Sequence, residues 1–190
     1  MKDLLLKIKN CTACEKHLEF GVNPIIAAST KSRIIIIGQA PGKIVHETGI
    51  PWNDKSGDNL RNWLGIDKTS FYDSNLFALM PMGFCYPGKD KTGDLPPRPE
   101  CAPLWHQQLL VYMKHAKLIL LIGQYAQNYY LGDKAKNTLT ETVQHFNTYL
   151  PKYFPLPHPS PRNNIWQAKN KWFGLKVLPE LQKRVLQITR

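Results

Sequence analysis

The chain has 190 residues, 43% of them hydrophobic, which predicts one folded domain spanning residues 1–190 and excludes a disordered chain. No stretch approaches the ~20 consecutive apolar residues of a membrane-spanning helix, and the first residues do not resemble a secretory signal, so we expect a cytoplasmic monomer without membrane contact. The formal net charge of +11 favours a polyanionic partner, with nucleic acid first, over ordinary surface charge that keeps a protein soluble.

Short apolar runs alternate with amphipathic stretches along the chain. The runs are too short for helices and are rich in β-branched or aromatic residues, so they predict buried strands, whereas the stretches predict helices. Strands that alternate with helices are typical of an α/β fold, here a three-layer α/β/α domain with a central, four-stranded, mostly parallel sheet. In chain order we expect a helix at 1–10, a strand at 33–37, a helix at 56–64 capped by Ser56, a strand at 76–80, a helix at 104–115, a strand at 118–122, a helix from Gly123 through Tyr130, an amphipathic stretch at 138–150, an edge strand at 153–156 and a C-terminal helix at 169–190 interrupted near Gly174.

A proline-rich stretch at 86–103 predicts a long loop, and loops of this length are uncommon unless they are functional or tied down. Cys85 and Cys101 bracket the loop, and Cys11 and Cys14 have the C-x-x-C spacing whose sulfurs can share one metal ion or cluster. Disulfides are not expected in a cytoplasmic chain. The four cysteines therefore indicate a metal centre that ties the loop down; the alternative is two buried thiols and a chance pair.

Two short loops, far apart in the sequence, each follow a predicted strand. Residues 38–42 read Gly-Gln-Ala-Pro-Gly, and residues 158–163 read His-Pro-Ser-Pro-Arg-Asn. Because the carboxyl ends of parallel strands meet at one edge of a sheet, we expect both loops to border one crevice. The first loop brings backbone N–H groups close to a ligand, and His158 supplies a hydrogen-bond donor or a proton near neutral pH.

Taken together, the two loops resemble the two signature motifs of the uracil-DNA glycosylase superfamily, and the resemblance extends from Cys11 to about Phe173. The second motif is most similar to the single-strand-selective class. The cysteine pattern is similar to the iron–sulfur class, in which a [4Fe-4S] cluster has a structural role. The resemblance therefore implies such a cluster, with zinc as the less favoured alternative, held by Cys11, Cys14, Cys85 and Cys101.

The first motif departs from the superfamily pattern, since Gln39 and Ala40 stand where its members carry Glu or Asp. Asp54 and Ser56 repeat the Asp-x-Ser spacing of a related thermophile class that also lacks a carboxylate in this motif. The resemblance thus implies Asp54 as the residue that holds water, with a surface turn residue as the alternative. It also implies that Gln39 and Ala40 border the base. His158 would donate a hydrogen bond to the leaving base, with a structural, cap-like histidine as the alternative.

Further site residues follow from the resemblance. Trp52 matches the aromatic residue that stacks on a base flipped out of the helix, with core packing as the alternative. Asn75 precedes the second strand and matches the amide that reads the edge of uracil and rejects cytosine, with a turn amide as the alternative. Arg162 would fill the space of the extruded nucleotide. The residues expected to contact DNA are Gly42, Ser160, Pro161 and Arg162.

We predict a monofunctional uracil-DNA glycosylase, a DNA repair hydrolase that cleaves the N-glycosidic bond of uracil or a related deaminated base in DNA. No lysine is placed like a Schiff-base nucleophile, so strand cleavage is not expected. Three alternatives remain, and the departures at Gln39 and Ala40 motivate the first of them. These are a non-catalytic or differently reacting DNA-binding iron–sulfur protein on the same fold, a member of the superfamily that acts on another lesion such as hypoxanthine or a mismatched base, and a redox or zinc protein.

Overall fold

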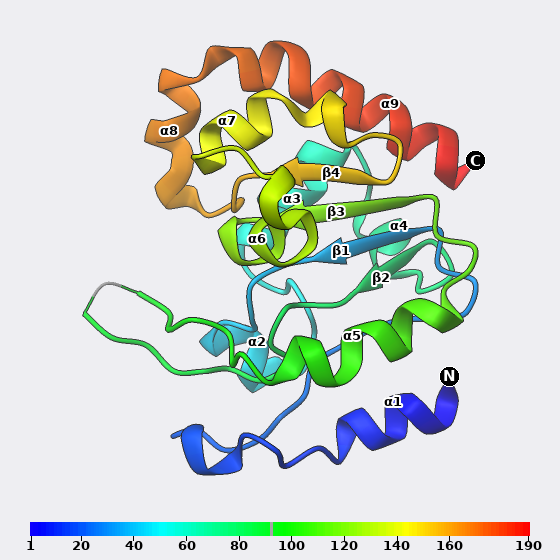
Figure 1. Cartoon of the computed structure of the whole chain (residues 1–190), viewed down its shortest axis with the longest axis vertical. Coiled ribbons are helices and arrows are strands. Elements are labelled where there is room, and N and C mark those ends of the chain that lie inside the picture. The colour runs from blue at the N-terminus through cyan, green and yellow to red at the C-terminus, as the bar shows by residue number, and fades with distance from the viewer. Residues whose placement is uncertain (92) are drawn as a thin grey trace.

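The computed structural model describes residues 1–91 and 93–190. Its four strands are β1 at Ile34–Ile37, β2 at Phe77–Leu79, β3 at Leu118–Ile122 and β4 at Tyr153–Leu156. They form one parallel sheet with the order β2-β1-β3-β4, which confirms the sheet predicted from the apolar runs (Figure 1). β4 lies at an edge, where Pro155, which has no N–H to donate, is tolerated.

Helices cover both faces of this sheet. In the described residues they are α1 at Lys2–Lys9, α2 at Lys43–Thr48, α3 at Lys55–Leu64, α4 at Lys68–Tyr72, α5 at Cys101–Tyr112, α6 at Gln124–Leu131, α7 at Leu139–Gln144, α8 at Asn164–Lys169 and α9 at Leu178–Thr189. Ile35 and Ile37 of β1 pack with α1, α5 and α6, whereas Ile34 and Ile36 pack with α3, α7 and α9. This is the predicted three-layer α/β/α arrangement.

Short turns of other helical types join these elements. The 3₁₀ turns are η1 at Glu15–His17, η2 at Gly132–Lys134, η3 at Phe146–Tyr149 and η4 at Pro161–Asn163. The interruption predicted near Gly174 is present as the π-type segment η5 at Phe173–Val177, which leads directly into α9. No helix in the described part of the chain is long and apolar enough to cross a membrane.

Two helix starts differ from the sequence prediction. α3 begins at Lys55 with Asp54 as its N-cap, so the prediction of Ser56 as the cap was wrong. The Asp54 carboxylate captures a free N–H of the first turn and starts the helix earlier. α5 begins at Cys101, before Pro103, because the first turn of a helix tolerates a residue without an N–H.

Part of the long loop predicted at 86–103 is a hairpin. Lys89 and Asp94 pair across it as an antiparallel bridge. The backbone N–H of Leu95 donates a hydrogen bond to the carbonyl of Gly88 at 2.9 Å. The hairpin extends outward from the side of the molecule at which the strands end (Figure 1).

Candidate active site

The carboxyl ends of the strands border a cavity of about 550 Å³. Most of its lining comes from four segments: the loop 38–42 after β1, the segment 51–56 leading into α3, the hairpin after β2, and the loop 158–163 after β4. Ile25, Val45 and Pro81 add to these walls. The two loops singled out in the sequence therefore meet at one cavity. The predicted site residues that line it are Gln39, Ala40, Gly42, Trp52, Asp54, His158, Ser160 and Arg162.

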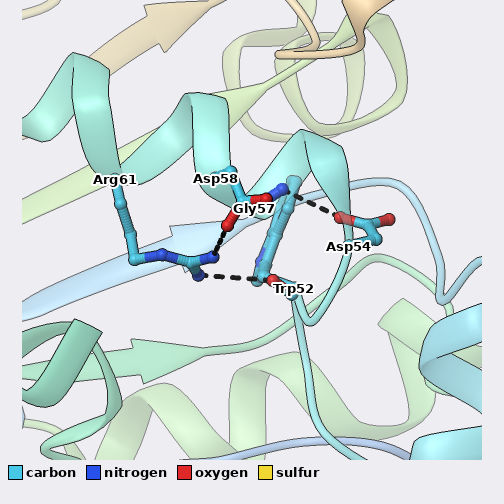
Figure 2. A network of polar contacts seen from close by, with 5 residues as sticks. All are labelled: Trp52, Asp54, Gly57, Asp58 and Arg61. Atoms are coloured by element: carbon cyan, nitrogen blue, oxygen red, sulfur yellow. Dashed lines mark hydrogen bonds and ion pairs between the residues drawn. The ribbon is translucent and has the colours of Figure 1, made fainter.

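The backbone of Trp52 is held in a left-handed conformation with a φ of 57°. This conformation costs about 1–3 kcal/mol for a residue with a side chain, so surrounding contacts must fix it. The Trp52 carbonyl accepts a hydrogen bond from Nη1 of Arg61 at 3.3 Å, and the buried Arg61 pairs with Asp58 at 2.6 Å (Figure 2). Gly57 leaves room for this carbonyl, since a Cβ there would lie 1.8 Å from its oxygen.

The Trp52 indole packs between the two loops. It covers Gly38, where an added Cβ would lie 2.7 Å from its Cζ2. The centroid of its ring lies 5.9 Å from that of the His158 imidazole, at an interplanar angle of 32°. The half-buried indole thus contacts the core of the domain while part of its surface borders the cavity.

Asp54 combines a structural contact with a place in the cavity. Its Oδ1 accepts a hydrogen bond from the backbone N–H of Gly57 at 2.8 Å, which caps α3 (Figure 2). The half-buried carboxylate also acts on His158, whose pKa it raises against the larger effect of burial. The position is compatible with both alternatives from the sequence, a turn residue and a site carboxylate.

Burial lowers the pKa of His158 below its ordinary value, and the neighbouring Asp54 opposes this only in part. The imidazole is therefore neutral at neutral pH and can donate one N–H to a ligand. Side chains hold its loop in place. Asn163 Nδ2 donates to the His158 carbonyl at 2.7 Å, and Asn59 Nδ2 donates to the Pro159 carbonyl at 2.9 Å.

The loop 38–42 presents no carboxylate to the cavity. Gln39 is half-buried, and its Nε2 donates to the carbonyl of Leu95 in the hairpin at 3.3 Å. Ala40 adds only a methyl group, and Gly42 is the N-cap of α2. The carboxylates that line this cavity therefore belong to other segments of the chain.

The sequence analysis missed Asp94, which brings a second carboxylate to the cavity. Burial raises the pKa of Asp94, and the charge of Asp54 raises it further, while Arg162 and Lys89 oppose both effects. A signal was present in the sequence, because a long loop with an acidic residue beside Gly93 fits a functional segment better than a plain connection. Nothing in the loop's sequence showed that it folds back onto the first motif.

The structure does not bring Asn75 to the cavity. Asn75 precedes β2 and so lies at the opposite, amino edge of the parallel sheet, where its Oδ1 accepts a hydrogen bond from Ser29 Oγ at 3.2 Å. Beyond the carboxyl end of β2, Pro81 lines the cavity instead, and its carbonyl accepts a hydrogen bond from Nε2 of the buried His106 at 3.0 Å. Reading of a base edge by Asn75 does not fit this geometry.

The four cysteines line a second, smaller cavity near the start of α5. The sulfur of Cys101 accepts a hydrogen bond from the backbone N–H of Phe84 at 3.3 Å. Burial raises the pKa of Cys101 to about 12 and also raises that of Cys85. Within residues 1–91 and 93–190, no group of three or more His, Cys, Asp or Glu side chains is arranged to hold a metal ion. Four thiol donors around one space nevertheless suit the soft metals of a cluster.

The fold and the paired loops define the class of protein. Residues 26–182 match the model of the Uracil DNA glycosylase superfamily, and the chain belongs to this superfamily. Two similar proteins are each named Type-4 uracil-DNA glycosylase. That of Sulfurisphaera tokodaii is 25% identical over 174 residues, which cover 83% of this chain and 75% of the relative. That of Thermotoga maritima is 26% identical over 161 residues, which cover 81% and 78%. The resemblance inferred from the two loops is confirmed.

Proposed function

We propose that this protein removes uracil from DNA by hydrolysis of the N-glycosidic bond, leaving an abasic site. The observation that carries the proposal is the convergence of both motif loops on one cavity, with Trp52, Asp54 and His158 in its walls. Membership of the superfamily and the similarity to two Type-4 uracil-DNA glycosylases support it. The formal net charge of +11 suits a polyanionic substrate.

The reaction needs a stabilised anion and a stabilised cation, because the base leaves with the bonding electrons and the sugar becomes positively charged. The neutral imidazole of His158 donates a hydrogen bond to the oxygen of the leaving base. The charge of Asp54 offsets the developing charge of the sugar. The target base must leave the DNA stack to reach these groups, and the indole of Trp52 offers it an aromatic surface.

DNA binds across the mouth of the cavity in this proposal. Arg162 is exposed in the cavity wall, next to the exposed Pro161, and fills the space of the extruded nucleotide. Ser160 and the backbone at Gly42 lie beside the same mouth and contact phosphates. Gln39 and Ala40 border the base.

A [4Fe-4S] cluster held by the four cysteines completes the proposal. The thiols share one cavity and come from the N-terminal segment, the stretch that follows β2 and the start of α5. When bound, the cluster supplies covalent cross-links between these segments, which contributes to folding. The ligands are Cys11, Cys14, Cys85 and Cys101.

The position of Asn75 favours a second candidate, a wider range of deaminated bases. Without an amide at that edge of the cavity, discrimination between uracil and hypoxanthine rests on pocket shape and on Gln39. The test is a panel of oligonucleotides, each with one uracil, hypoxanthine or undamaged base, single-stranded or paired. We expect release of free uracil and none of cytosine. Release of hypoxanthine as well as uracil would favour the second candidate, and release of no base would contradict both.

A further inference from the structure

Two carboxylates line the main cavity in the described residues, and their surroundings differ. Oδ1 of Asp54 is bound to the N–H of Gly57 at 2.8 Å, so the cap of α3 restricts its orientation. Asp94 instead reaches across to the first motif. Its Oδ2 lies 3.5 Å from the point that a Cβ on Gly42 would occupy. The hairpin therefore places a carboxylate beside the motif that lacks one of its own.

Hydrogen bonds fix the hairpin next to Asp94. Both backbone polar groups of the next residue, Leu95, form hydrogen bonds. Its N–H donates to Gly88 at 2.9 Å, and its carbonyl accepts the hydrogen bond from Gln39 at 3.3 Å. Gln39 thus ties the first motif to the hairpin beside Asp94, which keeps this carboxylate in the cavity without a charged residue in the motif.

The groups that face Asp94 set its basicity. Arg162 and Lys89 lower the pKa of its carboxyl, whereas burial and the charge of Asp54 raise it by more. The phenol of Tyr86 also lies within range, and the charge of Asp94 contributes to the raised pKa of that group. A carboxylate whose pKa is raised toward the operating pH accepts a proton from water more readily than an ordinary one.

We propose that Asp94, which lies outside both motifs, is the catalytic base that activates the attacking water. The inference rests on the proposed function. The oxygen of water bonds to C1′ of the deoxyribose as the bond from C1′ to the base nitrogen breaks. The bonding electron pair leaves with the base, which His158 stabilises, and the proton of the water passes to Asp94. The carboxylate of Asp54 offsets the positive charge of the sugar.

The first experiment replaces Asp94 with an isosteric amide. Asp94→Asn should lower the single-turnover rate of uracil excision by about 10²-fold, a typical contribution of a general base. DNA affinity should stay unchanged or rise slightly, because a negative charge is removed. The wild-type rate should increase with pH as Asp94 loses its proton, and the variant should lack this increase. Asp90→Asn is the matched control, since it removes the same charge from the same hairpin and keeps an acceptor for the N–H of Gly93.

The second experiment separates chemistry from structure. In Asp94→Ala, added formate should restore part of the excision rate, because a free carboxylate can occupy the vacated space. If the wild type releases uracil and Asp94→Asn releases it at the same rate with the same pH profile, this inference alone is overturned. A loss of rate in Asp94→Asn that Asp90→Asn shares, without rescue by formate, would also overturn it. A wild type that releases no uracil would overturn the proposed function, and this inference with it.

Discussion

At the scale of single residues, Asp54 both caps α3 and places a carboxylate in the cavity, and substitutions can separate these two roles. Asparagine caps helices about as well as aspartate but has no charge. Asp54→Asn should therefore keep the free energy of unfolding while lowering single-turnover excision by about ten-fold, with DNA affinity nearly intact. Asp54→Ala should lose the same activity and also about 0.5–2 kcal/mol of stability, because the N–H of Gly57 loses its acceptor. Unchanged turnover in Asp54→Asn would remove this carboxylate from the mechanism.

Arg162 gives a second prediction at this scale. It is exposed beside the cavity, in the turn η4 that begins at Pro161. Arg162→Ala should weaken binding and slow excision from paired DNA more than from single strands, because only a duplex leaves a hole to fill. Lys31→Ala, a loss of the same charge just before β1 at the amino edge of the sheet, is the control. Equal losses on both substrates would indicate a phosphate contact, and no loss on either would mean that this loop does not touch DNA.

At the scale of elements, α5 supports the wall of the cavity through a buried histidine that contacts the backbone of Pro81. His106 is 1% exposed. Its Nδ1 lies 2.7 Å from the hydroxyl oxygen of Tyr130, and its Nε2 donates a hydrogen bond to the Pro81 carbonyl. Burial lowers its pKa from 6.5 to about 4. The unfolded chain binds a proton at this site more readily than the folded one. The contribution of the neutral His106 to stability is therefore complete above the pKa of this histidine in the unfolded chain. It is lost as the pH falls toward the pKa of His106 in the folded protein.

This linkage predicts a measurable loss of stability in mild acid. Between about pH 7 and pH 5 the free energy of unfolding should fall by about 2 kcal/mol through His106. In His106→Gln this part of the fall should be absent, which urea unfolding at both pH values measures. His145→Gln, a substitution of an exposed histidine, should behave as the wild type. If His106→Gln shows the same fall as the wild type, His106 is not the group that titrates.

The sequence predicted the elements better than the site. Composition alone predicts a strand such as β1, which consists of four consecutive isoleucines buried on both faces of the sheet. The two motif loops could be placed because every strand ends at the same edge. The same rule places Asn75, which precedes its strand, at the opposite edge, and only the resemblance had assigned this residue to the site. Asp94 was missed because its position depends on contacts between the hairpin and the first motif, which no local pattern records.

At the scale of the whole molecule, the cysteine cavity joins segments that are distant in sequence. Purified without oxygen, the protein should contain iron and sulfide in equal amounts. Cys85→Ala should lose both and unfold at a lower temperature, because the cross-link between the N-terminal segment and α5 is gone. Thr12→Ala, within the same C-x-x-C loop, should keep the cluster. Zinc in place of iron, or a metal-free protein of full stability, would contradict the cluster.

The central claim is that the convergence of the two motif loops makes this domain a catalyst of base excision. The most direct measurement is single-turnover release of uracil from a uracil-containing oligonucleotide by the wild type, His158→Ala and His145→Ala. The wild type and His145→Ala should release uracil at equal rates, whereas His158→Ala should be slower by about 10²–10³-fold with DNA binding retained. Equal rates in all three proteins, or no release by the wild type, would contradict the claim.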